Sequence, residues 1–246
     1  MGSFVIDALP EQAARYRETH ALVVVDVFRA TTVIVTALAG GHAVYPVGTL
    51  AEALNTAGRL SASLLAGEQA GIKPDGFDLD NSPAAVSELR GSAPIVLLSS
   101  AGTLLLSNCR GASAIYVACL RNMSATAEQL AGHRRVALIG AGTRGQRRPE
   151  DQLVCSRIAQ LLAGAGFRPE NEATRQEMLQ WRDTDVDQLR SSPSADYLRG
   201  SGQEADIEFV LSHLDDISEV AVYNGQQVSL LPAAELGNVA LAAEAT

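Results

Sequence analysis

The sequence is poor in aromatic residues and in lysine, and both shortages limit what the protein can be. Aromatic residues make up 4% and hydrophobic residues 47% of the 246 residues. The core must therefore consist of Ala, Val, Leu and Ile, which suits a parallel sheet covered by helices. Lys73 is the single lysine, so a side chain that grips an oxyanion is expected to be arginine, with its planar fork of donors.

The sequence also lacks an excess of positive charge, long apolar runs and a recognisable cysteine spacing. The net charge of −9 argues against nucleic-acid binding, which needs clustered Lys and Arg. No apolar run reaches 18 residues, so no membrane span is expected, and no signal peptide is recognised. Cys109, Cys119 and Cys155 match neither a zinc nor a disulfide spacing. We therefore expect a cytoplasmic protein with no nucleic-acid or membrane partner.

Short apolar segments alternate with segments of helical periodicity over the first two thirds of the chain. Continuous apolar strands that alternate with helices indicate parallel βα units, and hence an α/β fold with a mostly parallel sheet flanked by helices. Ligands bind at the carboxyl ends of the strands in such sheets, so the turns after the strands are where chemistry is expected. The expected strands are residues 22–27, 43–47, 94–98, 114–118 and 136–139, and the expected helices are residues 31–38, 50–65, 124–131 and 150–163.

Three later segments break this alternation. Residues 182–203 are polar, with Ser, Pro and Gly, and are expected to be a linker. Residues 207–214 predict a helix, and residues 220–231 predict a β-hairpin that turns at Asn224-Gly225.

This pattern divides the chain into two portions. Residues 1–165 are expected to form the main α/β portion that carries the site loops. Residues 166–246 are expected to form a C-terminal portion that contains the hairpin, with a second subdomain packed on the first as one arrangement.

The first group of chemically informative residues follows the strand that begins at Leu22. Asp26 lies near the carboxyl end of this apolar strand, where a buried carboxylate is costly unless it meets a cation or a metal. Arg29 is the nearest cation, and Thr31 and Thr32 fall at the expected helix start, where hydroxyls and free N–H groups hold anions. A structural Asp–Arg pair beside an ordinary helix cap explains the same residues equally well.

The second group lies in a long loop, residues 67–83, which is rich in Gly, Pro and Asp. Loops of this length inside compact domains are often functional. Glu68 and Asp78 offer the oxygen ligands that magnesium prefers, and Asn81-Ser82 before a proline is typical of a helix start. A solvated acidic loop with a cap is the alternative.

A third group, Ser99 to Thr103, follows a clean strand. Small and hydroxyl-bearing residues at such a turn can cradle an anion with their N–H groups, which makes Ser100, Gly102 and Thr103 candidate binding residues. A plain strand-to-helix turn is the alternative. None of the four histidines falls in a metal-ligand spacing.

The fourth group, Gly140 to Gly145, matches G-x-G-x-x-G, the pattern of dinucleotide-binding proteins. In that pattern the helix begins within the glycines, whereas here Pro149 sets a later helix start. Glu150 and Asp151 either favour the helix dipole or supply a base or metal ligand. An NAD(P)-dependent oxidoreductase, with Glu170 or Glu172 on the ribose, remains an alternative function.

The order and content of these turns resemble the 2-phosphosulfolactate phosphatase family. The resemblance rests on the run D-V-x-R-A-T-T at Asp26–Thr32, the run G-F-D-x-x-N-S-P at Gly76–Pro83, and the turns at Gly67–Gly71 and Ser99–Thr103. It implies an α/β fold and a Mg²⁺-dependent hydrolase that converts 2-phosphosulfolactate to sulfolactate and phosphate, in coenzyme M biosynthesis.

The resemblance also suggests roles for individual residues around a small anionic phosphate ester. Water is expected to attack the ester directly, with Asp151 orienting or deprotonating it, and Asp26 as a covalent nucleophile is the alternative. The expected catalytic residues are Asp26, Arg29 and Asp151, the expected metal ligands are Glu68 and Asp78, and the expected substrate-binding residues are Thr31, Thr32, Asn81, Ser82, Ser100, Gly102 and Thr103.

Several positions depart from the family pattern. Gln69 stands where the family usually has Arg, and Asp80 stands where Gly is usual. Both changes make the site less positive, which leaves open another phosphorylated hydroxy acid as substrate, or a catalytically silent member of the family. A homo-oligomer is expected on general grounds for an enzyme of this size.

Overall fold

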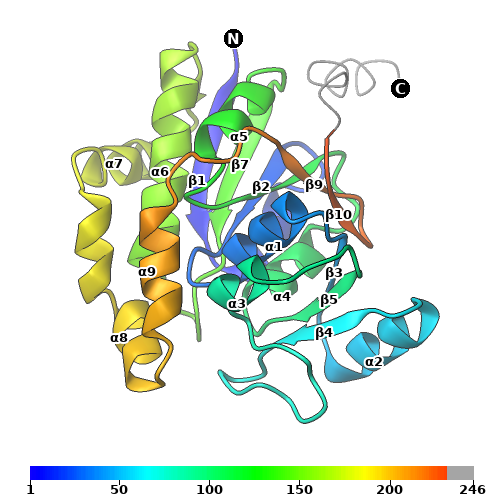
Figure 1. The fold of residues 1–246 in the computed structure, drawn as a ribbon. Helices are drawn as coiled ribbons and strands as arrows, with labels where there is room; N and C mark the ends of the chain where they lie inside the picture. Colours follow the sequence, from blue (N-terminus) through cyan, green and yellow to red (C-terminus); the bar gives the residue numbers. More distant parts are fainter. Residues whose placement is uncertain (232–246) are drawn as a thin grey trace.

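One ten-stranded sheet organises residues 1–231, the part of the chain that the computed structural model describes (Figure 1). The strand order across the sheet is β4-β5-β3-β10-β9-β6-β2-β7-β1-β8. The strands are β1 (Ser3–Ala8), β2 (Ala21–Val25), β3 (Val44–Val47), β4 (Leu64–Gly67), β5 (Ile95–Leu98), β6 (Ile115–Ala118), β7 (Arg135–Gly140), β8 (Arg168–Pro169), β9 (Ala221–Tyr223) and β10 (Val228–Leu230).

The sheet consists of two parallel halves joined by an antiparallel hairpin. Strands β4, β5 and β3 pair in parallel, and so do β6, β2, β7, β1 and β8. The hairpin β9–β10 lies between them, antiparallel to β6 on one side and to β3 on the other. The predicted α/β fold with a mostly parallel sheet and a C-terminal hairpin is confirmed. The hairpin belongs to the same sheet as the strands of the first 165 residues.

Helices cover both faces of this sheet. The side chains of β2 alternate: Val23 and Val25 pack against α5 and α6, whereas Leu22 and Val24 pack against α1 and α4. All four valines and leucines are fully buried, as expected for a strand covered on both sides. The helices are η1 (Pro10–Arg15), α1 (Ala30–Ala39), α2 (Leu50–Arg59), α3 (Pro83–Ser87), α4 (Gly102–Cys109), α5 (Met123–Leu130), α6 (Pro149–Gly164), α7 (Glu172–Gln180), η2 (Val186–Ser191), α8 (Pro193–Gly200) and α9 (Glu204–Ser212).

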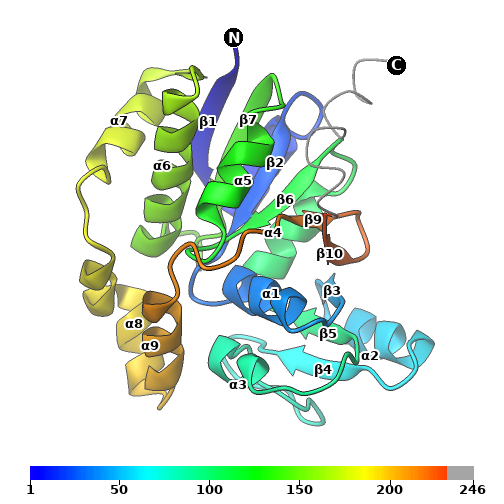
Figure 2. The same cartoon turned by 45° about the horizontal axis from the view of Figure 1, so that its top comes forward.

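The expected linker at residues 182–203 is wrong, because this segment contains η2 and α8. Ser192 caps α8 by accepting a 3.2 Å hydrogen bond from the backbone N–H of Ala195, and Pro193 occupies the first helical turn. Ala195 and Leu198 are buried in the core. The polar residues that suggested a linker lie on the exposed faces of short helices. Helices α8 and α9 lie side by side beyond the sheet (Figure 2).

Three strands were not predicted from the sequence: β1, β4 and the two-residue β8. The expected helix at residues 50–65 ends at Arg59, and the chain reverses at Ser61-Ala62 before β4 begins at Leu64. Ala62 adopts a positive φ of 55°, which breaks the helical path.

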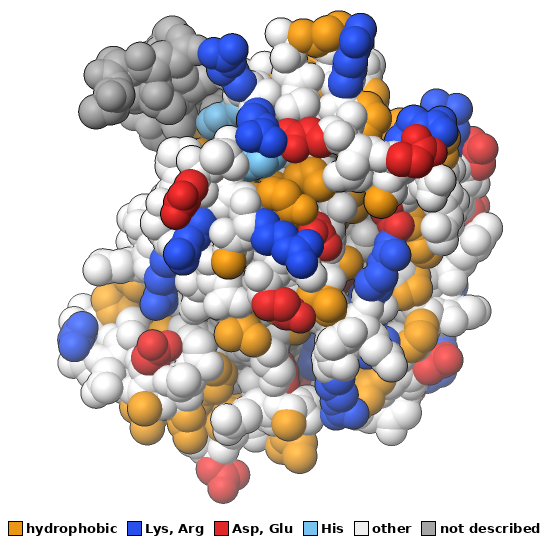
Figure 3. All heavy atoms as spheres, turned by 180° about the vertical axis from the view of Figure 1, so that it is seen from behind, with side chains coloured by type: hydrophobic (Ala, Val, Ile, Leu, Met, Phe, Trp, Pro, Cys, Tyr) orange, Lys and Arg blue, Asp and Glu red, His pale blue; other side chains and the backbone are white. Residues whose placement is uncertain are grey.

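No helix within residues 1–231 combines the length and the apolar character that crossing a membrane requires. On the face shown in Figure 3, Lys and Arg side chains are interspersed with Asp and Glu.

Candidate active site

A cavity of about 590 Å³ lies at the carboxyl ends of the strands and is walled on one side by α8. Its volume is in the range of small-molecule sites. The turns after four parallel strands contribute to its lining, as expected for a sheet of this kind. The polar lining residues are Asp26 and Arg29 after β2, Glu68 after β4, Ser99 and Ser100 after β5, Thr143, Arg144 and Arg148 after β7, together with Glu11, Asn81, Ser194 and Tyr197.

The N-terminus of α4 brings two carboxylates together in this cavity. Glu68 accepts hydrogen bonds from the backbone N–H of Ser100 (2.6 Å), the Ser100 hydroxyl (2.9 Å) and the backbone N–H of Gly71 (2.6 Å). The backbone N–H groups of Gly102 and Ala30 point at Asp26. Because a helix N-terminus carries partial positive charge, it favours both carboxylates at this position.

Glycine is required at position 102 for this arrangement. A Cβ atom there would lie 2.6 Å from Asp26 Oδ2 and 2.6 Å from Ala30 Cβ, and real Cβ atoms do not approach so closely. The backbone of α4 can therefore reach the Asp26 carboxylate only because residue 102 has no side chain.

Negative charge accumulates around Asp26. Burial, with added repulsion from Glu68 and Glu150, raises the pKa of Asp26 to about 7. Burial, followed by the nearby carboxylates of Asp26 and Glu150, raises the pKa of Asp151 well above its usual value. Burial also raises the pKa of Glu150. A cation beside Asp26 would relieve this repulsion.

Asp26 and Glu68 fit the ligand preferences of magnesium. Mg²⁺ usually takes one or two carboxylates and fills its other positions with water and substrate oxygens. Within residues 1–231, no group of three or more His, Cys, Asp and Glu side chains is arranged to hold a metal. Of the three carboxylates that line the cavity, Glu11 is exposed, so a magnesium ion here would depend on the buried pair, Asp26 and Glu68.

Asp78, the other expected metal ligand, does not line the cavity. It is exposed, and its Oδ2 accepts a 2.8 Å hydrogen bond from the backbone N–H of Leu65. This contact ties the long loop to the first half of β4, whereas Glu68 follows the end of the same strand.

Arg29 lines the cavity, but its charge is balanced within the protein. Its Nη1 donates a 2.7 Å hydrogen bond to Oδ2 of Asp206 in α9, and its Nη2 lies 3.7 Å from Asp80 Oδ1. Asp206 is 2% exposed and also accepts hydrogen bonds from the Ser82 hydroxyl (2.5 Å) and the backbone N–H of Ala84 (3.2 Å). Ser82 and Asp206 therefore act in the wall of the site.

Three of the expected binding hydroxyls close turns behind the cavity. Thr31 Oγ1 donates to the carbonyl oxygen of Asp26 (2.8 Å), Thr32 Oγ1 to that of Val27 (2.8 Å), and Thr103 Oγ1 to that of Ser99 (2.7 Å). All three threonines are buried, and none lines the cavity.

Ser100 and Asn81 do line the cavity. The Asn81 side-chain Oδ1 is buried without a hydrogen-bond partner among residues 1–231.

Asp151 lies behind the cavity wall and joins two of its loops. Its Oδ1 accepts a 2.9 Å hydrogen bond from the backbone N–H of Val27, and its Oδ2 accepts one of 3.1 Å from that of Gly142. The side chain is 2% exposed and is not part of the lining. In this position it holds the turns after β2 and β7 in register.

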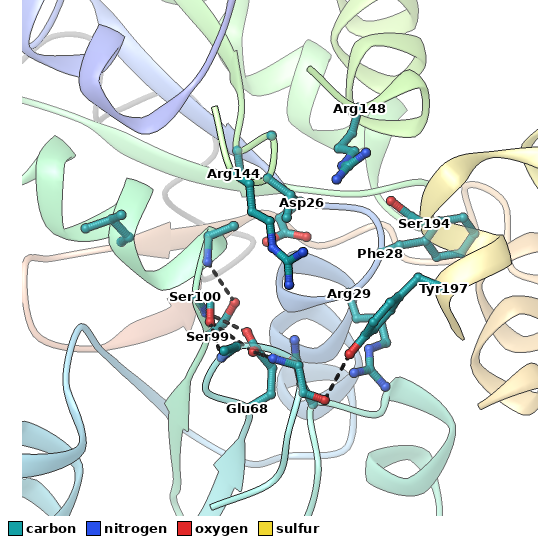
Figure 4. Close-up of a pocket in the computed structure, with 18 of the residues that line it drawn as sticks. Asp26, Phe28, Arg29, Glu68, Ser99, Ser100, Arg144, Arg148, Ser194 and Tyr197 are labelled. Carbon is teal, nitrogen blue, oxygen red and sulfur yellow. Dashed lines mark hydrogen bonds between the residues drawn. The ribbon is translucent and has the colours of Figure 1, made fainter. Parts of the chain in front are cut away.

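Sequence reasoning missed the residues that α8 and the turn after β7 contribute. In Figure 4, Arg144 and Arg148 point into the cavity from the side opposite Glu68 and Ser100. Tyr197 of α8 reaches across and donates a 3.2 Å hydrogen bond to the carbonyl oxygen of Gly71. The arginine content of the glycine-rich turn was the only local signal, and nothing near Tyr197 indicated a site.

Comparison with known proteins gives a single family. A family model described as 2-phosphosulpholactate phosphatase matches residues 7–226, which include every lining residue of the cavity. The chain belongs to this family.

Three relatives, each named a probable 2-phosphosulfolactate phosphatase, illustrate the match. The protein from Pseudothermotoga lettingae is 36% identical over 220 residues, or 87% of this chain and 93% of its own length. The Thermotoga petrophila protein is 34% identical over 194 residues, 78% of this chain and 84% of its own. The Symbiobacterium thermophilum protein is 33% identical over 224 residues, 89% of this chain and 88% of its own.

In this member of the 2-phosphosulpholactate phosphatase family, the glycine-rich motif does not have dinucleotide-binding geometry. The backbone groups of Thr143 and Gln146 bond to each other in a closed turn (2.8 and 3.0 Å), and α6 begins only at Pro149. Glu170 bonds to Ser3 and Arg135, where β1 and β7 begin, at the opposite end of the strands from the cavity. The geometry thus does not favour the oxidoreductase alternative.

Proposed function

We propose that this protein is a Mg²⁺-dependent phosphatase that hydrolyses a small acidic phosphate monoester, with 2-phosphosulfolactate as substrate and sulfolactate and phosphate as products. Membership of the family supports the reaction class. The observation that carries the proposal is the convergence of Asp26 and Glu68 on the N-terminus of α4 inside the cavity. Two buried carboxylates that line one cavity and repel each other are suited to a divalent cation and costly without one.

Asp26 and Glu68 would hold the metal, and other side chains would position the ester. When bound, Mg²⁺ would stabilise the charge on the phosphoryl oxygens and make a water molecule more acidic. Ser100 and Asn81 line the cavity and can hydrogen-bond the phosphate. In the reaction, the water oxygen forms a bond to phosphorus while the bond to the ester oxygen breaks, and the leaving oxygen takes up a proton. Phe28 and α8 close one side of the cavity and limit the access of bulk water.

Two further residues would act through their neighbours. Asp151 holds the backbone of Val27 and Gly142, and Arg29 joins the loop after β2 to α9. We assign both to positioning, since positioned groups contribute to catalysis by holding reacting atoms in line.

The experiment compares phosphate release from 2-phosphosulfolactate with Mg²⁺ and with a chelator. Asp26→Asn and Glu68→Gln are expected to lower kcat/KM by about 100-fold or more, since each removes a charge that holds the metal. Asp78→Asn is the matched control, because Asp78 lies in the same loop but outside the cavity, and its activity should stay within about 3-fold of the wild type. Equal losses in all three variants would contradict the proposed metal site.

A catalytically silent protein is the second candidate, and one contact favours it. Asp80, where the family usually has Gly, lies 3.7 Å from Arg29 Nη2 and further reduces the positive charge of the cavity wall. A silent protein would release no phosphate from any phosphate ester at any Mg²⁺ concentration. Asp80→Gly would then be expected to restore phosphate release.

A further inference from the structure

The side chains of two arginines in the cavity have no hydrogen-bonded partner. Arg144 and Arg148 both line the cavity, and neither guanidinium group forms an ion pair or a hydrogen bond among residues 1–231, although the charge of Arg148 lowers the pKa of the nearby Glu150. The Nε atom of Arg148 is in addition buried without a partner. Arg147, between them in the sequence, pairs with Glu177 outside the cavity instead. Arg144 is exposed and Arg148 is half-buried, so both guanidinium groups are accessible from the cavity, where an oxyanion can form charge-assisted hydrogen bonds with them.

The turn that carries these arginines is built to hold Arg144 in place. Gly142, Arg144 and Gly145 all have positive φ values, of 59°, 52° and 71°. The turn is closed by the two backbone hydrogen bonds between Thr143 and Gln146. Asp151 anchors its start through the backbone N–H of Gly142. The left-handed conformation of a non-glycine residue such as Arg144 costs about 1 kcal/mol of folding free energy. The fold keeps this conformation at a residue whose side chain lines the cavity.

The cavity contains groups of both charges. Asp26 and Glu68 contact the N-terminus of α4, and Glu11 also lines the cavity. In Figure 4, Arg144 and Arg148 enter from the side opposite Glu68, Arg144 lies beside Asp26, and Ser194 of α8 lies near Arg148. A ligand that fits such a cavity presents its metal-binding phosphate to Asp26 and Glu68 and a second anionic group to the two arginines.

We infer that Arg144 and Arg148 form an anion site for the acidic group of the substrate that is not hydrolysed, a carboxylate or a sulfonate. Arginine binds such oxyanions through two parallel hydrogen bonds. The inference rests on the proposed function and extends it, because it assigns selectivity for diacidic esters to two residues outside the metal site.

The test measures kcat/KM for three esters that differ in their second acidic group. 4-Nitrophenyl phosphate has none, 2-phospholactate adds a carboxylate, and 2-phosphosulfolactate adds a carboxylate and a sulfonate. Arg144→Gln and Arg148→Gln are each expected to lower kcat/KM for the acidic esters by about 10- to 100-fold and to change that for 4-nitrophenyl phosphate by less than about 3-fold. A loss confined to 2-phosphosulfolactate would identify the sulfonate as the bound group, and a loss shared with 2-phospholactate the carboxylate.

Arg147→Gln is the matched control, because it removes the same charge from the same turn at a residue that faces away from the cavity. It should leave the rates for all three esters within about 2-fold of the wild type. If the Arg144 and Arg148 variants lower all three rates equally, or behave like the control, the proposed anion site is contradicted. The proposed phosphatase activity is unaffected by that result.

A binding measurement separates this inference from the proposed reaction. Sulfolactate contains both acidic groups but no phosphate, and its affinity can be measured by calorimetry with or without Mg²⁺. The wild type is expected to bind it at least about 10-fold more tightly than the Arg144→Gln/Arg148→Gln double variant. If sulfolactate binding depends on the two arginines but the protein hydrolyses no ester, the anion site is supported and the proposed phosphatase activity is contradicted.

Discussion

The Nη1 atom of Arg29 lies 2.7 Å from Oδ2 of Asp206, although the two residues are 177 positions apart in the sequence. Both side chains are nearly inaccessible, with 4% and 3% of their surfaces exposed. The same carboxylate caps α3 through Ser82 and Ala84. One buried acid on α9 thus links the turn after β2, the loop before α3 and the C-terminal helices.

Removal of this carboxylate should destabilise the whole protein. Asp206→Ala leaves the Arg29 charge buried with only the more distant Asp80, and loss of one partner of a buried pair costs about 3–5 kcal/mol. Chemical denaturation should therefore show a clearly lower free energy of unfolding. Asp196→Ala, which removes an exposed acid paired with Arg199 in α8, is the control and should cost no more than about 1 kcal/mol.

The double variant Arg29→Met/Asp206→Leu adds a second check. It removes both charges together, and it should recover part of the stability that Asp206→Ala loses. A double variant that is less stable than Asp206→Ala would mean that the charges themselves stabilise the fold.

Gly102→Ala should impair activity more than stability. The added Cβ would meet Asp26 Oδ2 and Ala30 Cβ at 2.6 Å, so either α4 or the Asp26 carboxylate must move. Displacement of a catalytic group by about 1 Å can cost about 100-fold in rate, and kcat/KM for 2-phosphosulfolactate is expected to fall by that order. Gly58→Ala in α2 serves for comparison, because nothing lies within 4 Å of a Cβ at that position. Equal activities of the two variants would contradict the close-approach argument.

Magnesium affinity should depend on pH through Asp26. Burial and the neighbouring carboxylates raise the pKa of Asp26 to about 7 in the metal-free protein, so a proton competes with the metal below that pH. Affinity should be present above pH 7 and be lost as the pH falls, with a dissociation constant about 10-fold larger at pH 6 than at pH 8. Calorimetric titrations at the two pH values measure this ratio. Identical affinities would exclude Asp26 as a ligand with this pKa.

Tyr197→Phe should weaken metal binding by a small factor. The lost hydrogen bond to the Gly71 carbonyl oxygen contributes about 1 kcal/mol. The backbone N–H of Gly71 in turn donates a hydrogen bond to Glu68. Greater mobility of Gly71 should therefore make the Glu68 carboxylate, a proposed metal ligand, less well positioned. The Mg²⁺ concentration for half-maximal activity is expected to rise about 3- to 5-fold, measured against Tyr45→Phe in β3. A lowered kcat at saturating Mg²⁺ with unchanged metal dependence would assign Tyr197 to substrate contact instead.

The sequence was most informative where local pattern and tertiary environment agree. Strand β2 is apolar over its whole length because it is covered on both faces, so its type and the turn after it were predictable. Strand β4 was not predictable, because its short apolar run follows the apolar pattern of α2 without a break in the sequence. The chain reversal at Ala62 that separates the two elements leaves no signal in the composition. Local composition likewise made α8 resemble a linker, since its buried residues, Ala195 and Leu198, are few.

The site was predictable only as far as strand ends could be recognised. Asp26 and Glu68 both follow strands, and the geometry brings them into one cavity. Asp78 shares the loop and the chemistry of Glu68, and only the path of the chain separates them. Asp206 and Tyr197 act through contacts more than 100 residues distant in sequence, for which no local pattern exists.

The position of the β9–β10 hairpin has a consequence during synthesis of the chain on the ribosome. Until residues 221–230 emerge, β3 and β6 each leave an edge unpaired, since the hairpin is the neighbour of both. Unpaired edges are templates for pairing with other chains. A nascent or C-terminally shortened polypeptide is therefore prone to aggregate through the unpaired edges of β3 and β6. Pairing of the β9–β10 hairpin with both strands removes these edges.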